Sequence, residues 1–89
     1  VVIGVIDSTT HTLKKSPDLI SRGFVYLKES QDLLYQTRLL TKKVIDDSLL
    51  RGGYTNLDQM KQDVVEATTK FLLQKTAKRP VIIPVIISV

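Results

Sequence analysis

A nearly unbroken run of aliphatic residues closes this chain and limits what it can fold into. The run extends from Val81 to Val89 and is interrupted only by Pro84 and Ser88. Left in water, each large aliphatic side chain would forgo about 1.5–3 kcal/mol of burial free energy. The run is far shorter than the roughly 20 apolar residues that a membrane-spanning helix needs. We therefore predict a buried C-terminal strand that is apolar on both faces.

The length and composition indicate one small globular domain over residues 1–89. Hydrophobic residues make up 43 % of the chain and charged residues 25 %, which is typical of a folded protein rather than a disordered one. The absence of cysteine excludes a disulfide framework and a thiolate zinc site. No signal peptide or transmembrane stretch is visible, so we expect no membrane partner. Because the chain starts on the strand-like Val1-Val2-Ile3 without a methionine, we expect a piece of a longer protein.

Hydrophobic periodicity and turn residues predict five elements in the order β-β-α-α-β. A polar stretch over residues 8–17 separates the first two strands and reads as a hairpin loop. Ser30 can cap the first helix, and Gly52-Gly53 ends it. The predicted elements are a strand over 1–7, a strand over 20–27, a helix over 31–50, a helix capped by Asn56, and a strand after Pro80.

The second helix has the clearest pattern in the chain. Asn56 precedes it as an N-cap, and Gln59 stands where a capping box returns the hydrogen bond. Its predicted buried stripe contains Phe71, which we expect to anchor the core where the helix meets the sheet. The whole predicted stripe is Leu57, Met60, Val64, Ala67, Phe71 and Leu72. The stripe of the first helix is Leu33, Thr37, Leu40, Val44 and Ser48.

These elements define an α+β fold, in which an αα-hairpin covers one face of a three-stranded sheet. The strand order stays open. If the second strand is central, the sheet is wholly antiparallel, whereas a central first strand places the last strand parallel to it. Because Pro84 has no N–H group, the last strand belongs at an edge or carries a bulge.

The uncovered face of this sheet is the candidate interaction surface. Two helices can cover only one face, and exposed aliphatic patches usually mark a partner surface. The alternative is that twist or the strand ends hide these side chains locally. The residues that we expect to meet a second copy or another domain are Val2, Ile6, Ile82, Pro84 and Ile86.

No arrangement of residues in the sequence suggests catalysis. His11 is the only histidine, and zinc needs three or four ligands. Asp46 and Asp47 are adjacent on a helix and point about 100° apart, so they do not converge on a substrate. We therefore predict no catalytic, metal-binding or cofactor-binding residue in this chain.

The net charge of +4 permits contact with RNA without establishing it. The thirteen lysines and arginines are scattered along the chain. Most of them are expected to lie on solvated faces. The candidate RNA contacts are Lys14, Lys15 and Arg22.

Two sequence blocks carry a family resemblance. They are Asp-Leu-Ile-Ser-Arg-Gly-Phe-Val-Tyr at 18–26 and Lys-Arg-Pro-Val-Ile-Ile-Pro-Val-Ile at 78–86. With them, the chain resembles the C-terminal domain of ribonuclease J, a metallo-β-lactamase/β-CASP ribonuclease. The resemblance implies a non-catalytic accessory domain of a cytoplasmic bacterial enzyme of RNA processing and decay, supporting oligomerisation and activity.

The same resemblance implies where the chemistry lies. Such enzymes hold two zinc ions, or manganese or magnesium, through a His-x-His-x-Asp-His motif, and that motif does not occur in these 89 residues. The implied partners are a second copy in a homodimer or homo-oligomer, the catalytic part of its own chain, and RNA through that part. The alternative from another class is a stand-alone RNA-binding module that uses its basic surface; an independent enzyme is the least supported reading.

Overall fold

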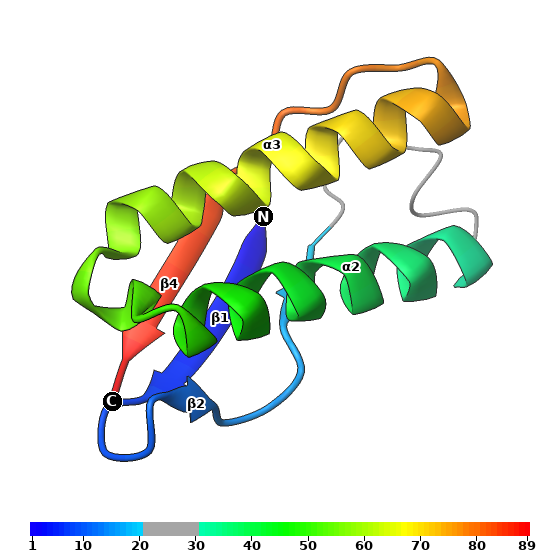
Figure 1. Ribbon diagram of the computed structural model, residues 1–89. Helices are drawn as coiled ribbons and strands as arrows, with labels where there is room; N and C mark the ends of the chain where they lie inside the picture. Colours follow the sequence, from blue (N-terminus) through cyan, green and yellow to red (C-terminus); the bar gives the residue numbers. More distant parts are fainter. Residues whose placement is uncertain (21–30) are drawn as a thin grey trace.

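The computed structural model describes residues 1–20 and 31–89, where two antiparallel helices lie across one face of a sheet (Figure 1). This is the α+β fold that the sequence predicts. The strands are β1 (Val2–Asp7), β2 (Thr12–Leu13), β3 (Asp18–Leu19) and β4 (Pro84–Ser88). The helices are α2 (Gln31–Leu50), the short 3-10 helix η1 (Gly53–Thr55) and α3 (Leu57–Thr76).

Strand β1 is central, which decides between the two strand orders left open. The strands β2 and β3 pair antiparallel with opposite ends of β1, whereas β4 pairs with it in parallel. The C=O of Val5 accepts from the Lys14 N–H at 2.9 Å, and the Val2 N–H donates to the Ile83 C=O at 2.9 Å. Since odd and even residues of a strand bond to opposite sides, β2 and β3 share one edge of β1 and β4 takes the other. Counted over residues 1–20 and 31–89, the sheet is thus three strands wide, and Pro84 lies in an edge strand as predicted.

The segment between the first two strands is not all loop. The strand β2 lies inside it and pairs Ile6 with Leu13, so the turn is confined to residues 8–11. In that turn the Asp7 carboxylate accepts from the N–H groups of Thr9 at 2.8 Å and Thr10 at 3.2 Å. Of the second predicted strand, residues 21–27 lie outside the described residues, and the described chain forms only Asp18–Leu19 as strand just before it.

Helix α2 has the predicted bounds and part of the predicted buried stripe. Its buried residues are Thr37, Thr41, Ile45, Ser48 and Leu49, which confirms Thr37 and Ser48, whereas Leu40 and Val44 are half-buried. Threonine can take these places because its hydroxyl bonds to a carbonyl of its own helix. Thr37 donates to the Leu33 C=O at 2.8 Å, and Thr41 donates to the Arg38 C=O at 2.9 Å. The predicted cap Ser30 lies outside the described residues.

Both glycines of the α2–α3 connection have a physical role. Gly52 follows the helix with φ 82°, in the left-handed region that favours glycine. A Cβ on Gly53 would collide with Ser48, including its carbonyl oxygen. Asn56 caps α3 as predicted, since its side chain accepts from the Gln59 N–H at 3.1 Å. The Gln59 side chain does not return a bond as a capping box would; it donates to Asp63 at 3.0 Å instead.

On α3 the deeply buried residues are Met60, Val64, Thr68 and Leu72. The expectation that Phe71 anchors the core is wrong: this ring is only half-buried, with the Lys75 ammonium 5.8 Å from its centroid. Leu72, one position further, is fully buried. The two positions are about 100° apart on the helix, so only one of them can point at the sheet.

The helices cover the opposite sheet face from the one that we expected. Val2, Ile6 and Ile86 belong to the core, with exposures of 2 %, 1 % and 9 %. Ile82 packs against that core, and Pro84 is the register partner of Val2. The five residues proposed as an interface therefore lie on the helix-covered side, where Val2, Ile6 and Ile86 are buried and Ile82 and Pro84 are half-buried.

Gly4 gives the physical reason for this choice of face. A Cβ at this position would lie 3.2 Å from the Ile45 side chain and 3.3 Å from that of Ile86. The face that carries Gly4 therefore lets helix α2 approach β1 closely. A glycine inside a strand often marks such an approach, and it was the one signal in the sequence that could have assigned the faces.

Candidate interaction surface

The side chains of the other parity form the open face of the sheet, which we define as Ile3, Val5, Val85 and Ile87. Both helices lie on the opposite face of the sheet, in front of the strands in Figure 1. In the register, Ile3 stands beside Val85, and Val5 stands beside Ile87. Ile87 is 43 % exposed, and Ile83, just before the strand, is 53 % exposed. No element among residues 1–20 and 31–89 packs over these aliphatic side chains, so the open face is a contiguous apolar surface.

The two borders of the open face differ in charge. At the β2 and β3 border lie Asp7 and Asp18, and Lys15 pairs with Asp18 at 3.1 Å. The backbone N–H groups of Thr9 and Thr10 hold the pKa of Asp7 below its usual range. The β4 border carries no charged side chain between Pro80 and Val89. An apolar partner can therefore approach from the β4 side without desolvating a charge.

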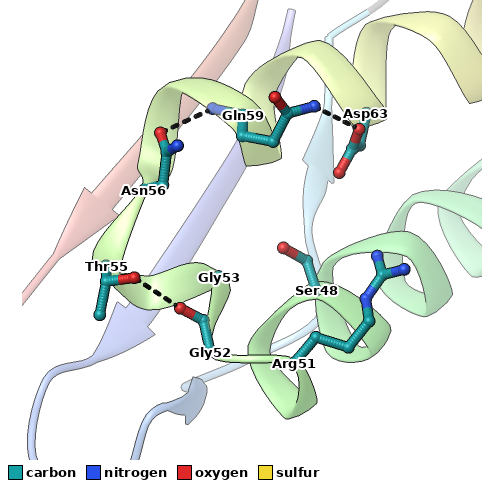
Figure 2. A pocket seen from close by; sticks show the side chains of 8 residues that line it. All are labelled: Ser48, Arg51, Gly52, Gly53, Thr55, Asn56, Gln59 and Asp63. Atoms are coloured by element: carbon teal, nitrogen blue, oxygen red, sulfur yellow. Dashed lines mark hydrogen bonds between the residues drawn. The ribbon is translucent and has the colours of Figure 1, made fainter.

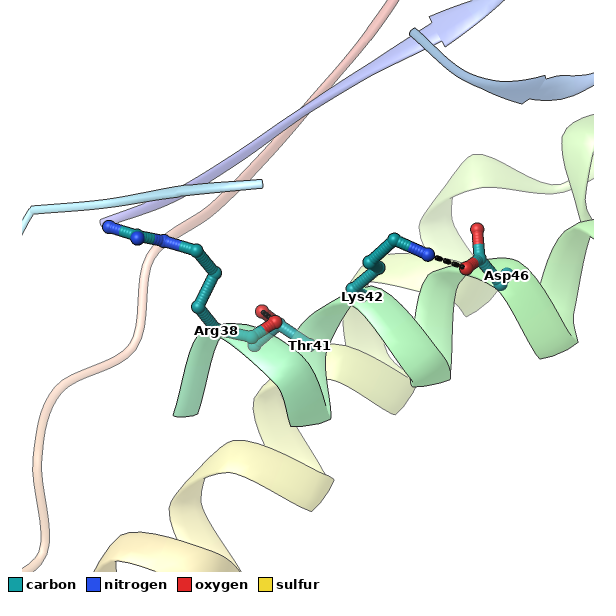
Figure 3. A network of polar contacts seen from close by, with 4 residues as sticks. All are labelled: Arg38, Thr41, Lys42 and Asp46. Carbon is teal, nitrogen blue, oxygen red and sulfur yellow. Dashed lines mark hydrogen bonds and ion pairs between the residues drawn. The ribbon is translucent and has the colours of Figure 1, made fainter. Parts of the chain in front are cut away.

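Of the three basic candidates, the structure describes Lys14 and Lys15. Lys14 and Lys15 are exposed after β2, and Lys15 is already paired with an acid. Arg22 lies outside the described residues. On α2, Lys42 donates to Asp46 at 2.8 Å, while the half-buried Arg38 extends toward the start of β1 (Figure 3). Lys15 and Lys42 are thus each already paired with an acid.

The lone histidine has a packing role. His11 has a positive φ of 57° in the turn after β1, and its ring stacks on Tyr54 of η1. The ring centroids are 3.7 Å apart, with an interplanar angle of 12°. This contact joins the β1–β2 turn to the α2–α3 connection, which is a structural use of the imidazole.

A polar hollow of about 520 Å³ lies between the end of α2 and the start of α3 (Figure 2). Several of its polar groups bond to one another. Thr55 donates to the Gly52 C=O at 2.9 Å, and the Gln59 side chain bridges toward Asp63. Because these groups are already paired, the hollow has the character of a helix connection rather than of a reaction site.

Two further properties bound the function of the described part of the chain. Within residues 1–20 and 31–89, no group of three or more histidine, cysteine, aspartate or glutamate side chains could hold a metal ion. Over the same residues, neither helix is long and apolar enough to cross a bilayer.

Comparison with known proteins identifies the class of this domain. The family described as "Ribonuclease J C-terminal domain" matches residues 1–89. The chain therefore belongs to the ribonuclease J C-terminal domain family, as its terminal sequence blocks suggest.

Three individual relatives are ribonucleases J. The chain is 32 % identical over 89 residues to Ribonuclease J2 of Bacillus subtilis strain 168, covering 100 % of this chain and 16 % of the relative. It is 30 % identical over 86 residues to a Ribonuclease J 2 of Staphylococcus epidermidis, covering 97 % of this chain and 15 % of that protein. It is 29 % identical over 86 residues to Ribonuclease J 1 of Streptococcus pyogenes serotype M3, with the same two shares, 97 % and 15 %. The chain thus spans about one sixth of the length of these curated relatives.

Proposed function

We propose that this chain is the non-catalytic C-terminal accessory part of a longer bacterial ribonuclease J in the cytoplasm, and that its own role is self-association in support of the nuclease. The match of all 89 residues to this family carries the proposal. The open face supports it, because an aliphatic surface beside an uncharged border suits contact with a second copy. The catalytic part of the longer chain, with its two zinc, manganese or magnesium ions, is then a further partner, and RNA is met through that part.

Sedimentation velocity of the purified chain tests self-association. We expect the wild-type chain to dimerise at high micromolar concentration and Ile87→Lys to dissociate, since a two-fold interface places the new charge twice. Leu50→Lys is the matched control, because Leu50 is 86 % exposed at the end of α2 and away from the open face. A wild-type chain that stays monomeric would contradict self-association.

The chain alone is expected not to cleave RNA with Zn²⁺, Mg²⁺ or Mn²⁺. The physical reason is that a hydrolytic metal site needs several converging ligands, and the described residues contain no such group. The measurement is cleavage of a labelled RNA by pure protein at each metal ion. Metal-dependent cleavage that a point change in this chain abolishes would overturn the proposal.

The alternative, a stand-alone RNA-binding module, is favoured by Lys14 and Lys15, which are exposed and adjacent. It predicts that the isolated chain binds RNA with an affinity that falls steeply with salt. Replacing both lysines with alanine should then weaken binding and flatten the salt dependence. Fluorescence anisotropy with a labelled single-stranded RNA separates the two functions, since a self-association domain binds it weakly at every salt concentration.

A further inference from the structure

Among the described residues, strand β4 pairs through one of its two backbone edges. The Val2 N–H donates to the Ile83 C=O, and the Val89 N–H donates to the Ile6 C=O, both at 2.9 Å. Odd-numbered residues of the strand therefore bond to β1, and the N–H and C=O groups of Ile86 and Ser88 point outward. Among the strands that the structure describes, none pairs with this outer edge.

This outer edge lacks the usual protection against another chain. Soluble proteins guard an edge strand with lysine, proline, a bulge or a covering element. Within the part of the chain that the structure describes, Pro84 protects only the first residue of the strand, and no charged residue occurs between Pro80 and Val89. The exposed side chains of Ile83 and Ile87 flank the edge. An edge of this kind suits a specific partner strand.

We propose that the partner is the β4 strand of a second copy, paired antiparallel about a two-fold axis at Ile86. This inference rests on the proposed self-association and names the element that performs it. In this register, each Ile86 N–H donates to the partner's Ile86 C=O. Each Ser88 N–H donates to the partner's Pro84 C=O. The two sheets become one continuous sheet.

Pro84 selects this register. A pairing centred on Pro84 would lack its central hydrogen bonds, since proline has no N–H group. In the pairing centred on Ile86, the missing N–H of Pro84 lies opposite the C=O of the second copy's Ser88. That C=O is near the end of the strand, where water can bond to it. Val85 then stands opposite the partner's Ile87, and such β-branched cross-strand pairs stabilise a sheet. No charged side chain lies in the paired strands themselves, although each copy carries a net charge of +4.

Helix α3 extends the contact beyond the strand. It packs over β4, and its side toward α2 includes Ala67, which shares a hollow with Val44. The opposite side carries the half-buried Val65 and Thr69 and the 38 % exposed Leu73. They surround a hollow of about 400 Å³ that is also lined by Glu66, Lys70 and Arg79. The pairing brings this side of α3 toward the same side of the second copy. A strand pair alone would bury less than the roughly 800 Å² per partner of a stable interface, so this contribution matters.

Paired variants of the chain test the edge by sedimentation equilibrium, with circular dichroism as the check on folding. Ser88→Pro removes an outward N–H and leaves every bond to β1 in place, whereas Ser88→Ala keeps that N–H. We expect the dimer dissociation constant to rise at least about tenfold for Ser88→Pro, because two backbone hydrogen bonds are lost per dimer. Ser88→Ala should stay within about twofold of the wild type.

A third variant, Val5→Lys, places a charge at the centre of the open face and away from the outer edge. Edge pairing predicts that it still dimerises. If Val5→Lys dissociates while Ser88→Pro remains dimeric, the edge register is overturned and self-association stands. A monomeric wild type overturns both.

Amide hydrogen exchange followed by NMR gives a test that needs no variant. As the wild-type concentration is raised through the dimerisation range, exchange at the outward amides of Ile86 and Ser88 should slow. Exchange at Val85 and Ile87, whose amides face β1, should already be slow in the monomer. Dimerisation without a change at Ile86 and Ser88 would overturn the edge pairing, even if Ser88→Pro failed to fold.

Discussion

Neighbouring residues of the same chemical type have different roles here because the backbone points them to different surroundings. Leu72 is fully buried, while Leu73, the next residue of the same helix, is 38 % exposed. In β1, Val2 is in the core and Ile3 is on the open face. Hydrophobicity alone therefore does not rank these residues; their contribution to stability follows from position on the helix or parity in the strand.

The pair Phe71 and Leu72 gives the first residue-scale prediction. Leu72→Ala should lower the free energy of unfolding by about 2–5 kcal/mol, because it leaves a cavity in a closed core. Phe71→Ala should cost clearly less, although more atoms are removed, because the ring is already half-exposed. Urea titration of both variants measures the difference. A larger loss for Phe71→Ala would show that the ring, and not Leu72, anchors the core.

Thr68 gives the second residue-scale prediction. Its hydroxyl oxygen is buried and has no hydrogen-bond partner, which is unfavourable. Thr68→Val keeps the branched shape and removes the unpaired group, so it should stabilise the chain by up to about 1 kcal/mol. Thr41→Val is the control and should show no such gain, since the Thr41 hydroxyl is bonded to the Arg38 C=O. Destabilisation by Thr68→Val in a thermal melt would contradict this account.

At the scale of elements, the turn after β1 is held from two sides. Asp7 accepts two backbone N–H groups within the turn, and His11 stacks on Tyr54 of η1. The turn thereby links the sheet to the connection between the two helices. Its stability should depend on the ionisation of Asp7, because a carboxylate accepts hydrogen bonds more strongly than a carboxylic acid.

The pH dependence of that turn is a third prediction. The Thr9 N–H, and then the Thr10 N–H, lower the pKa of Asp7 in the folded chain. A lowered folded-state pKa stabilises the fold fully above the pKa of the unfolded chain, about 3.9, and that stability is lost as pH falls through the folded-state value. The thermal midpoint of the wild type should therefore exceed that of Asp7→Ala near neutral pH, and the difference should shrink below about pH 4.

Asp47→Ala supplies the control for that series. Asp47 is exposed on α2, so the variant changes the net charge by the same amount without touching the turn. A difference between the wild type and Asp7→Ala that stays constant into acid would show that the carboxylate does not support the turn.

At the scale of the whole molecule, helices cover one face of the sheet, whereas no described element covers the other. The open face and the outer edge of β4 expose aliphatic side chains, and no described strand pairs with that edge. A domain of this size has a small free energy of unfolding. A partner bound at the open face or at the outer edge of β4 therefore contributes a large fraction of its stability.

This asymmetry predicts that stability depends on concentration. A protein that dimerises only when folded is stabilised by mass action. Raising the chain concentration roughly a hundredfold should increase the thermal midpoint by several degrees, and Ser88→Pro should abolish that dependence. Scanning calorimetry at two concentrations measures it. An unchanged midpoint for the wild type would indicate a monomeric fold.

The sequence by itself determined the features whose causes are local. Helix α2 has its predicted bounds, Gly52 ends it and Asn56 caps α3, since helical periodicity and caps act within a few residues. Pro84 confined the last strand to an edge because a missing N–H needs no knowledge of the partner. The sequence blocks at 18–26 and 78–86 indicated the ribonuclease J C-terminal domain, because a resemblance of this kind is judged from the residues alone.

Only the tertiary structure decided which strand is central and which sheet face the helices cover. Strands β1 and β4 carry aliphatic side chains at both parities, so their sequences suit either face equally. The choice is made where Ile45 of α2 approaches Gly4, a contact between residues far apart in the chain. Once that contact fixes the covered face, the alternation of side chains along the strand places all the remaining ones. The prediction chose the wrong parity, and it therefore placed core residues on the open face.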